Sequence, residues 1–113
     1  LQFPVHAKNL DKTMELIYKF HKNPFIIAID SCLGYEDHVG YITLSSMPLC
    51  PGRGVSKHLP PIGDISITGV VDRFSESSHE TIQTTRLQTV FYLASFIAKG
   101  IQIPKFQVSY PPL

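Results

Sequence analysis

The most constraining feature of the sequence is an unbroken apolar run, Phe25 to Ile29, that directly follows the pair Asn23-Pro24. Proline disfavours helical geometry at the residue before it, so this pair ends any helix that precedes it. A short apolar run after such a break is typical of a buried strand in a mainly parallel sheet. The run is far shorter than the ~20 apolar residues of a membrane-spanning helix, so we expect no membrane partner.

Helical and strand patterns surround this run. Residues 9–22 predict a helix, with Asn9 as N-cap and with Leu10, Met14 and Ile17 on one face. Residues 39–44 and 64–72 predict two further strands. Between them, residues 48–63 are rich in proline and glycine and predict a long loop.

The strongest helix pattern lies in the last third of the chain. Ser77 and Glu80 form a capping-box pattern, and Gly100 is placed to end the helix. The predicted apolar face consists of Leu87, Val90, Phe91, Ala94, Ile97, Ala98 and Ile101. The order helix, strand, strand, loop, strand, helix predicts one α/β layered domain over residues 1–113.

Composition narrows the class of protein. The 113 residues are 43% hydrophobic and 17% charged, which is typical of one globular domain and not of a disordered chain. The net charge of +1 gives no field that would attract nucleic acid, so we expect no nucleic-acid partner. Cys32 and Cys50 predict two reduced thiols in a cytoplasmic protein, with a lone disulfide or a nucleophilic Cys32 as alternatives. The histidines lack metal-ligand spacing, so we expect no metal or cofactor.

Two aspartates are candidates for catalysis. Asp30 directly follows the apolar run, so we expect its carboxylate at the carboxyl end of a strand, partly desolvated and suited to acid or base work. Asp72 ends the third predicted strand, and adjacent parallel strands would bring the two carboxylates together as a pair that activates water. The alternatives are a turn-forming or capping Asp30 and a solvated loop Asp72.

A glycine-rich loop is the candidate for substrate binding. Gly52 and Gly54 flank Arg53, and Lys57 follows three residues later. Such glycines can turn backbone N–H groups toward an anion or a substrate backbone. The spacing does not match a phosphate-binding P-loop, and a merely tight turn is the alternative.

Several segments together carry a family resemblance. They are Pro4 to Ala7 with Asn9-Leu10, NPFIIAIDSCLG at residues 23–34, PGRGVSKHLPPIGDISITGVV at residues 51–71, and Gln83 to Leu87. In combination, from about Pro4 to Ile101, they resemble the YyaC-type sporulation proteins, a family proposed to be spore peptidases. That family is similar to the germination protease, which degrades small acid-soluble spore proteins.

The resemblance implies a fold, a site and a location. The fold would be a three-layer α/β/α sheet of the phosphorylase/hydrolase-like kind, related to hydrogenase-maturation peptidases. Asp30 matches a proposed catalytic carboxylate of the germination protease, and Pro51 to Gly54 resemble its PGxG loop. The implied function is a peptidase acting on small acid-soluble spore proteins through water activated by carboxylates, in the forespore or spore core.

The sequence also departs from the family pattern. The family's earlier Gly- and Asp-containing turn, which carries the other carboxylate, has no counterpart here, so we expect a truncated member with an incomplete sheet. An incomplete sheet exposes an edge and apolar surface, which favours dimerisation or aggregation, so a homo-oligomer is one of the expected partners. After the third strand, Asp72-Arg73-Phe74-Ser75 replace the family's Asn and Gly-rich turn, which keeps the Asp30–Asp72 pair as an alternative. The rival function is a non-catalytic binding or regulatory module in sporulation, and a third is a metal-dependent maturation peptidase.

Overall fold

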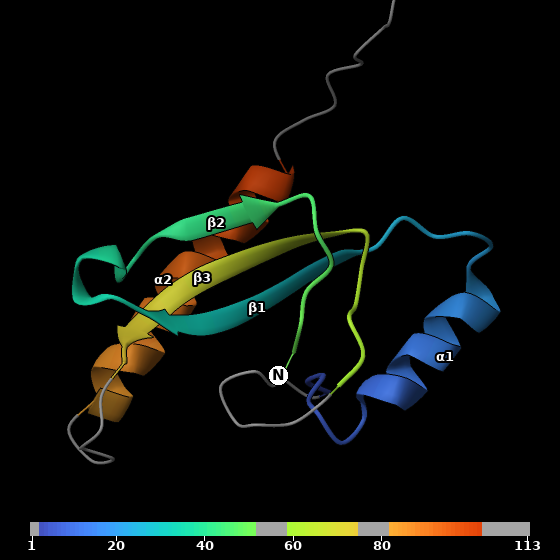
Figure 1. Ribbon diagram of the computed structural model, residues 1–113, viewed down its shortest axis with the longest axis horizontal. Helices are drawn as coiled ribbons and strands as arrows, with labels where there is room; N and C mark the ends of the chain where they lie inside the picture. Colours follow the sequence, from blue (N-terminus) through green and yellow to red (C-terminus); the bar gives the residue numbers. More distant parts are fainter. Residues whose placement is uncertain (1–2, 52–58, 75–81, 103–113) are drawn as a thin grey trace, which may run out of the picture.

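The computed structural model describes residues 3–51, 59–74 and 82–102, with side chains of the last segment described from Arg86 onward (Figure 1). These residues form a small α/β domain. Its elements are α1 (Leu10–Phe20), β1 (Ile27–Gly34), the short 3-10 helix η1 (Glu36–His38), β2 (Ile42–Ser45), β3 (Ile65–Arg73) and α2 (Ile82–Gln102).

The described strands form one mixed sheet in the order β1-β3-β2 (Figure 1). The pair β1–β3 is parallel, as the apolar run predicted, and β2–β3 is antiparallel. Asp64 fixes the start of the parallel pair, because its carboxylate Oδ2 accepts from the Ile26 N–H at 2.7 Å while its own N–H donates to the Ile26 carbonyl at 2.8 Å. Because β3 lies between the other two strands, it is the most buried of the three.

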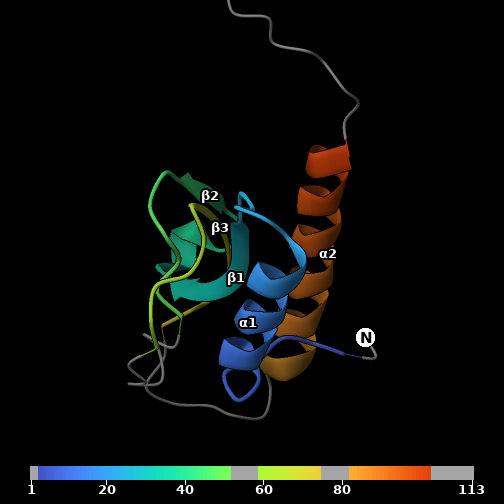
Figure 2. The same ribbon diagram turned by 90° about the vertical axis from the view of Figure 1, so that its right-hand side faces the viewer.

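Helix α2 lies along one face of the sheet, and α1 lies beyond the end at which β1 begins (Figures 1 and 2). Among the described residues, Leu93 is the most buried hydrophobic residue, at 3% exposure. It packs against Gly69 of β3, where a Cβ atom would come within 3.1 Å of Leu93 Cδ1. The glycine therefore lets the helix approach the central strand closely.

The apolar face predicted for the last helix is not the face that the sheet covers at the middle of α2. Leu93, which was not among the predicted residues, faces the sheet, whereas Leu87, Phe91 and Ile101 are 55%, 57% and 55% exposed. Two apolar stripes run along α2, and the periodicity alone could not say which one the sheet covers. None of the helices in the described part of the chain is long and apolar enough to cross a membrane.

Several predicted boundaries also shift. The first strand begins at Ile27 and continues through Asp30 to Gly34, so it does not end at Ile29. Gly100 lies inside α2, which ends at Gln102. Asn9 is the N-cap residue of α1, as predicted, but its side chain makes no capping bond; its Oδ1 accepts from the His6 N–H at 2.7 Å. The capping box of Ser77 and Glu80 lies outside the described residues.

Candidate functional site

Asp30 lies in the middle of β1, on the face of the sheet opposite α2. Its neighbour Ile29 lines a groove together with α2, and successive side chains of a strand alternate between the two faces. The carboxylate is exposed, and the hydrogen bond that it accepts among the described residues comes from the Ser31 N–H, at 2.8 Å. The prediction that Asp30 ends its strand in a partly desolvated position is therefore wrong, because β1 is longer than the apolar run and the carboxylate faces solvent.

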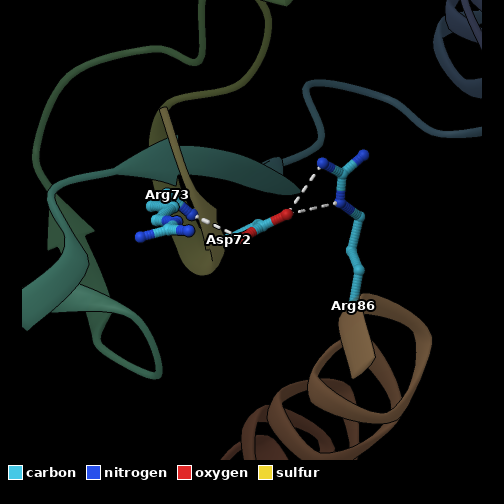
Figure 3. Close-up of polar contacts among 3 residues, drawn as sticks. All are labelled: Asp72, Arg73 and Arg86. Carbon is cyan, nitrogen blue, oxygen red and sulfur yellow. Dashed lines mark hydrogen bonds and ion pairs between the residues drawn. The ribbon is translucent and has the colours of Figure 1, made fainter. Parts of the chain in front are cut away.

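Asp72 lies near the end of β3 and is held by two arginines (Figure 3). Its Oδ2 accepts from Arg86 of α2, at 2.8 Å from Nη2 and 3.2 Å from Nε. Its Oδ1 accepts from the Arg73 backbone N–H at 2.7 Å. Only 14% of the Asp72 side chain is exposed, so this ion pair is substantially shielded from water on the carboxylate side.

These contacts decide the charge of Asp72. Burial raises the pKa of the carboxyl group, but the hydrogen bonds from Arg86 and from the Arg73 backbone, with the positive charges of both arginines, outweigh it. The net effect lowers the pKa below its ordinary value of 3.8. Asp72 is thus a fixed anion near neutral pH, which suits it to anchor α2 and makes it a poor proton donor.

A β-bulge aims Asp72 at the helix. The register runs Cys32↔Val70 and then Leu33↔Asp72, so Val71 is an extra residue on β3. If alternation ran unbroken through Val71, Asp72 would lie with Thr68 and Val70 on the face that carries Asp30. The bulge instead turns Asp72 to the face covered by α2, where it pairs with Arg86.

The two candidate carboxylates are consequently not brought together. Asp30 pairs with Thr68 across the β1–β3 ladder, and Asp72 pairs with Leu33. Three residues of strand, or roughly 10 Å, separate the two levels, and the side chains point from opposite faces. The catalytic roles of Asp30 and Asp72 stay predictions, but a shared proton between them has no geometric basis here.

The remaining predicted residues contribute less. Gly52, Arg53, Gly54 and Lys57 of the glycine-rich loop lie outside the described residues. Cys32 is half-buried, Cys50 is exposed, and both are free thiols. Within residues 3–51, 59–74 and 82–102, no group of three or more His, Cys, Asp or Glu side chains could hold a metal ion.

An aromatic cluster at the carboxyl end of β1 and β3 escaped the sequence analysis. Tyr35 meets His38 and Phe74 edge-on at 5.8 and 6.3 Å between ring centroids, and His38 stacks on Tyr41 at 5.1 Å. An ion pair of 3.3 Å between Arg73 and Glu36 borders it. Arg86 was missed as well; its place in a helix that packs beside the end of β3 was the available signal.

Comparison with known proteins identifies relatives of this chain. Residues 1–100 match the model of a family described as "Protein of unknown function (DUF1256)". The chain is 42% identical over 103 residues to a Bacillus subtilis (strain 168) protein called "Uncharacterized protein YyaC". That match covers 91% of this chain and 50% of the relative, so the chain spans about half the length of the curated relative. No solved structure matches.

Proposed function

Because the chain belongs to the family described as protein of unknown function (DUF1256), and so is a YyaC-type protein, we propose that it is a peptidase-related protein of the spore-forming cell. Its substrates would be small acid-soluble spore proteins, and its place of action the forespore or spore core. The three-layer α/β/α fold of hydrogenase-maturation peptidases belongs to the same proposal. The sequence resemblance around Asp30, at residues 23–34, is its source.

The observation that carries the proposal is the exposure of the Asp30 carboxylate and its lack of a cationic partner among the described residues. Its carboxylate is exposed on the sheet face away from α2, and no cation among the described residues pairs with it. A carboxylate that is free of ion pairs can accept a proton from water while the water oxygen attacks a peptide carbonyl. The peptide C–N bond then breaks and the proton passes to the leaving amine. The proposal takes the second carboxylate from outside the described residues, since Asp72 is neutralised by Arg86.

The second candidate is a non-catalytic module that binds spore proteins. The specific observation in its favour is that Asp30 and Asp72 lie on opposite faces of the sheet, so these two residues do not form a carboxylate pair. In this case Asp30 would be an ordinary surface carboxylate, and the protein would retain its partner without cleaving it.

One experiment separates the two functions. The purified protein is incubated with a small acid-soluble spore protein, and products are followed by mass spectrometry for wild type, Asp30→Asn and the control Asp37→Asn. Asp37 is an exposed aspartate of η1. The peptidase proposal expects cleavage by wild type and by the control but none by Asp30→Asn. Capture without cleavage, equal in all three proteins, supports the binding module, and undiminished cleavage by Asp30→Asn overturns the proposed site.

A further inference from the structure

A row of polar side chains crosses the sheet at the level of Asp30, on the face away from α2. Thr68 of β3 pairs directly with Asp30 of β1, and Thr43 of β2 pairs directly with Thr68. Gly69 faces Leu93 of α2, so its neighbour Thr68 lies on the other face of the sheet, with Asp30. Because residues that pair directly across strands share a face, Asp30, Thr68 and Thr43 form one continuous polar row.

The middle of this face is more open than its surroundings. Toward the start of β3, Ser66 is 6% exposed, and its hydroxyl donates to the Met47 carbonyl at 2.9 Å. The described chain between β2 and β3 lies on this side of the sheet, opposite α2 (Figure 2). In the other direction, Val70 is 7% exposed. Asp30 is exposed and Thr68 is half-buried, so a substrate on this face can reach the row between two buried levels.

The spacing of Asp30 and Thr68 suits a bridging water molecule. Neighbouring strands lie about 4.8 Å apart, so the Cβ atoms of a directly paired couple are about 5 Å apart. The Asp30 Oδ1 atom accepts from the Ser31 N–H, and among the described residues neither Asp30 Oδ2 nor the Thr68 hydroxyl has a hydrogen-bond partner. One water molecule can join two such polar groups when they are too far apart for a direct bond.

We propose that Thr68 is the residue that, together with Asp30, positions the water molecule for peptide hydrolysis. This inference rests on the proposed peptidase function. The water donates one hydrogen to Asp30 Oδ2 and the other to Thr68 Oγ1, which directs a lone pair of its oxygen away from the sheet, toward a substrate carbonyl. Holding both hydrogens in this way orients the nucleophile before the reaction begins.

The proton balance assigns different roles to the two side chains. As the water oxygen bonds to the carbonyl carbon, Asp30 takes the first proton. When the C–N bond breaks, this proton passes to the leaving amine, and the second water hydrogen stays with the new carboxyl group. Thr68 neither gains nor loses a proton, so its role is to orient the water.

Thr43 is the matched control within the same row. It lies on the same face, but two strand spacings, or about 10 Å, separate it from Asp30. One water molecule cannot bridge that distance. Thr43→Val therefore makes the same chemical change as Thr68→Val without removing a partner of the proposed water.

Steady-state cleavage of a small acid-soluble spore protein tests the role of Thr68. Valine has the shape of threonine without its hydroxyl group. Thr68→Val should lower kcat at least about tenfold with little change in KM, because one hydrogen bond to the attacking water is lost. Thr68→Ser keeps a hydroxyl group and should retain most of kcat, and Thr43→Val should match wild type. Circular dichroism confirms that all three variants stay folded.

The outcomes separate this inference from the function on which it rests. A wild type that cleaves nothing overturns the peptidase function, and the role of Thr68 with it. Cleavage by wild type that Thr68→Val leaves undiminished, or a Thr68→Ser variant as slow as Thr68→Val, overturns the role of Thr68 alone. A crystal structure adds a readout that does not depend on cleavage. A water within about 3 Å of both Asp30 Oδ2 and Thr68 Oγ1 supports the proposal, and its absence between two ordered side chains overturns it.

Discussion

The ion pair between Asp72 and Arg86 should be a measurable tie between the sheet and α2. Two hydrogen bonds of 2.8 and 3.2 Å converge on one oxygen of Asp72. Hydrogen bonds to charged groups contribute about 1.5–3 kcal/mol when fully formed, whereas exposed ion pairs contribute about 0.2–1 kcal/mol. Because Asp72 is 14% exposed and Arg86 44% exposed, this pair falls between these limits. We expect a coupling free energy of about 1 kcal/mol.

A double-mutant cycle with Asp72→Asn, Arg86→Gln and the combined variant measures that coupling by urea unfolding. Each single variant should lower the free energy of unfolding by about 1 kcal/mol, and the double variant should lose markedly less than the sum. In a domain of this size, 1 kcal/mol corresponds to a melting temperature roughly 4–8 °C lower. Additive losses would refute the reasoning, since they would mean that the two side chains do not interact.

The pH dependence of the same cycle has a defined sign. The pKa of Asp72 is lower in the folded protein than its ordinary value of 3.8, so the carboxyl binds its proton more weakly when folded. The coupling should be fully present above pH 3.8 and should disappear as the pH falls below 3.8 through the lowered pKa. A coupling that persisted well below that range would contradict the assignment.

Three further predictions concern the packing and the candidate site. Leu93→Ala should cost about 2–5 kcal/mol of unfolding free energy, because Leu93 is buried against the sheet. Leu87 is 55% exposed on the same helix, so Leu87→Ala should cost well under half of that. Equal losses in chemical denaturation would contradict the observed orientation of α2. Gly63→Ala should lower the free energy of unfolding by at least about 1–2 kcal/mol, because Gly63 has a φ of +85° and a Cβ there would lie 3.0 Å from the Ala28 Cβ. An unchanged melting temperature would count against this backbone conformation. Asp30→Asn should leave the melting temperature within about 2–4 °C of wild type, since its carboxylate is exposed and has no ion pair; a large loss of stability would show that Asp30 is structural.

Much of the architecture was predictable because local patterns agree with the fold. The break at Asn23-Pro24 and the run Phe25 to Ile29 placed a helix before a parallel strand, and β1 does pair in parallel with β3. The sequence could not reveal that β1 continues past Asp30, because the polar residues Asp30 and Ser31 carry none of the apolar signal by which a buried strand is recognised.

The candidate site was less predictable, because it depends on register and on packing between distant elements. The expectation of an Asp30–Asp72 pair assumed that both residues end their strands on the same face. One extra residue, Val71, turns Asp72 to the other face, and Arg86, which is 14 residues further along the chain, then fixes it there. A bulge and a partner on another element leave no periodic trace in a single sequence.

The claim that Asp72 is a fixed partner of Arg86 and not half of a carboxylate pair can be tested most directly by NMR. The titration of the Asp72 side-chain carboxyl would be followed in wild type, Arg86→Gln and Asp30→Asn. Our account predicts a pKa below 3.8 that rises in Arg86→Gln and is unchanged in Asp30→Asn. A clear shift of the Asp72 titration in Asp30→Asn, with none in Arg86→Gln, would show that the two carboxylates are coupled and would contradict the account.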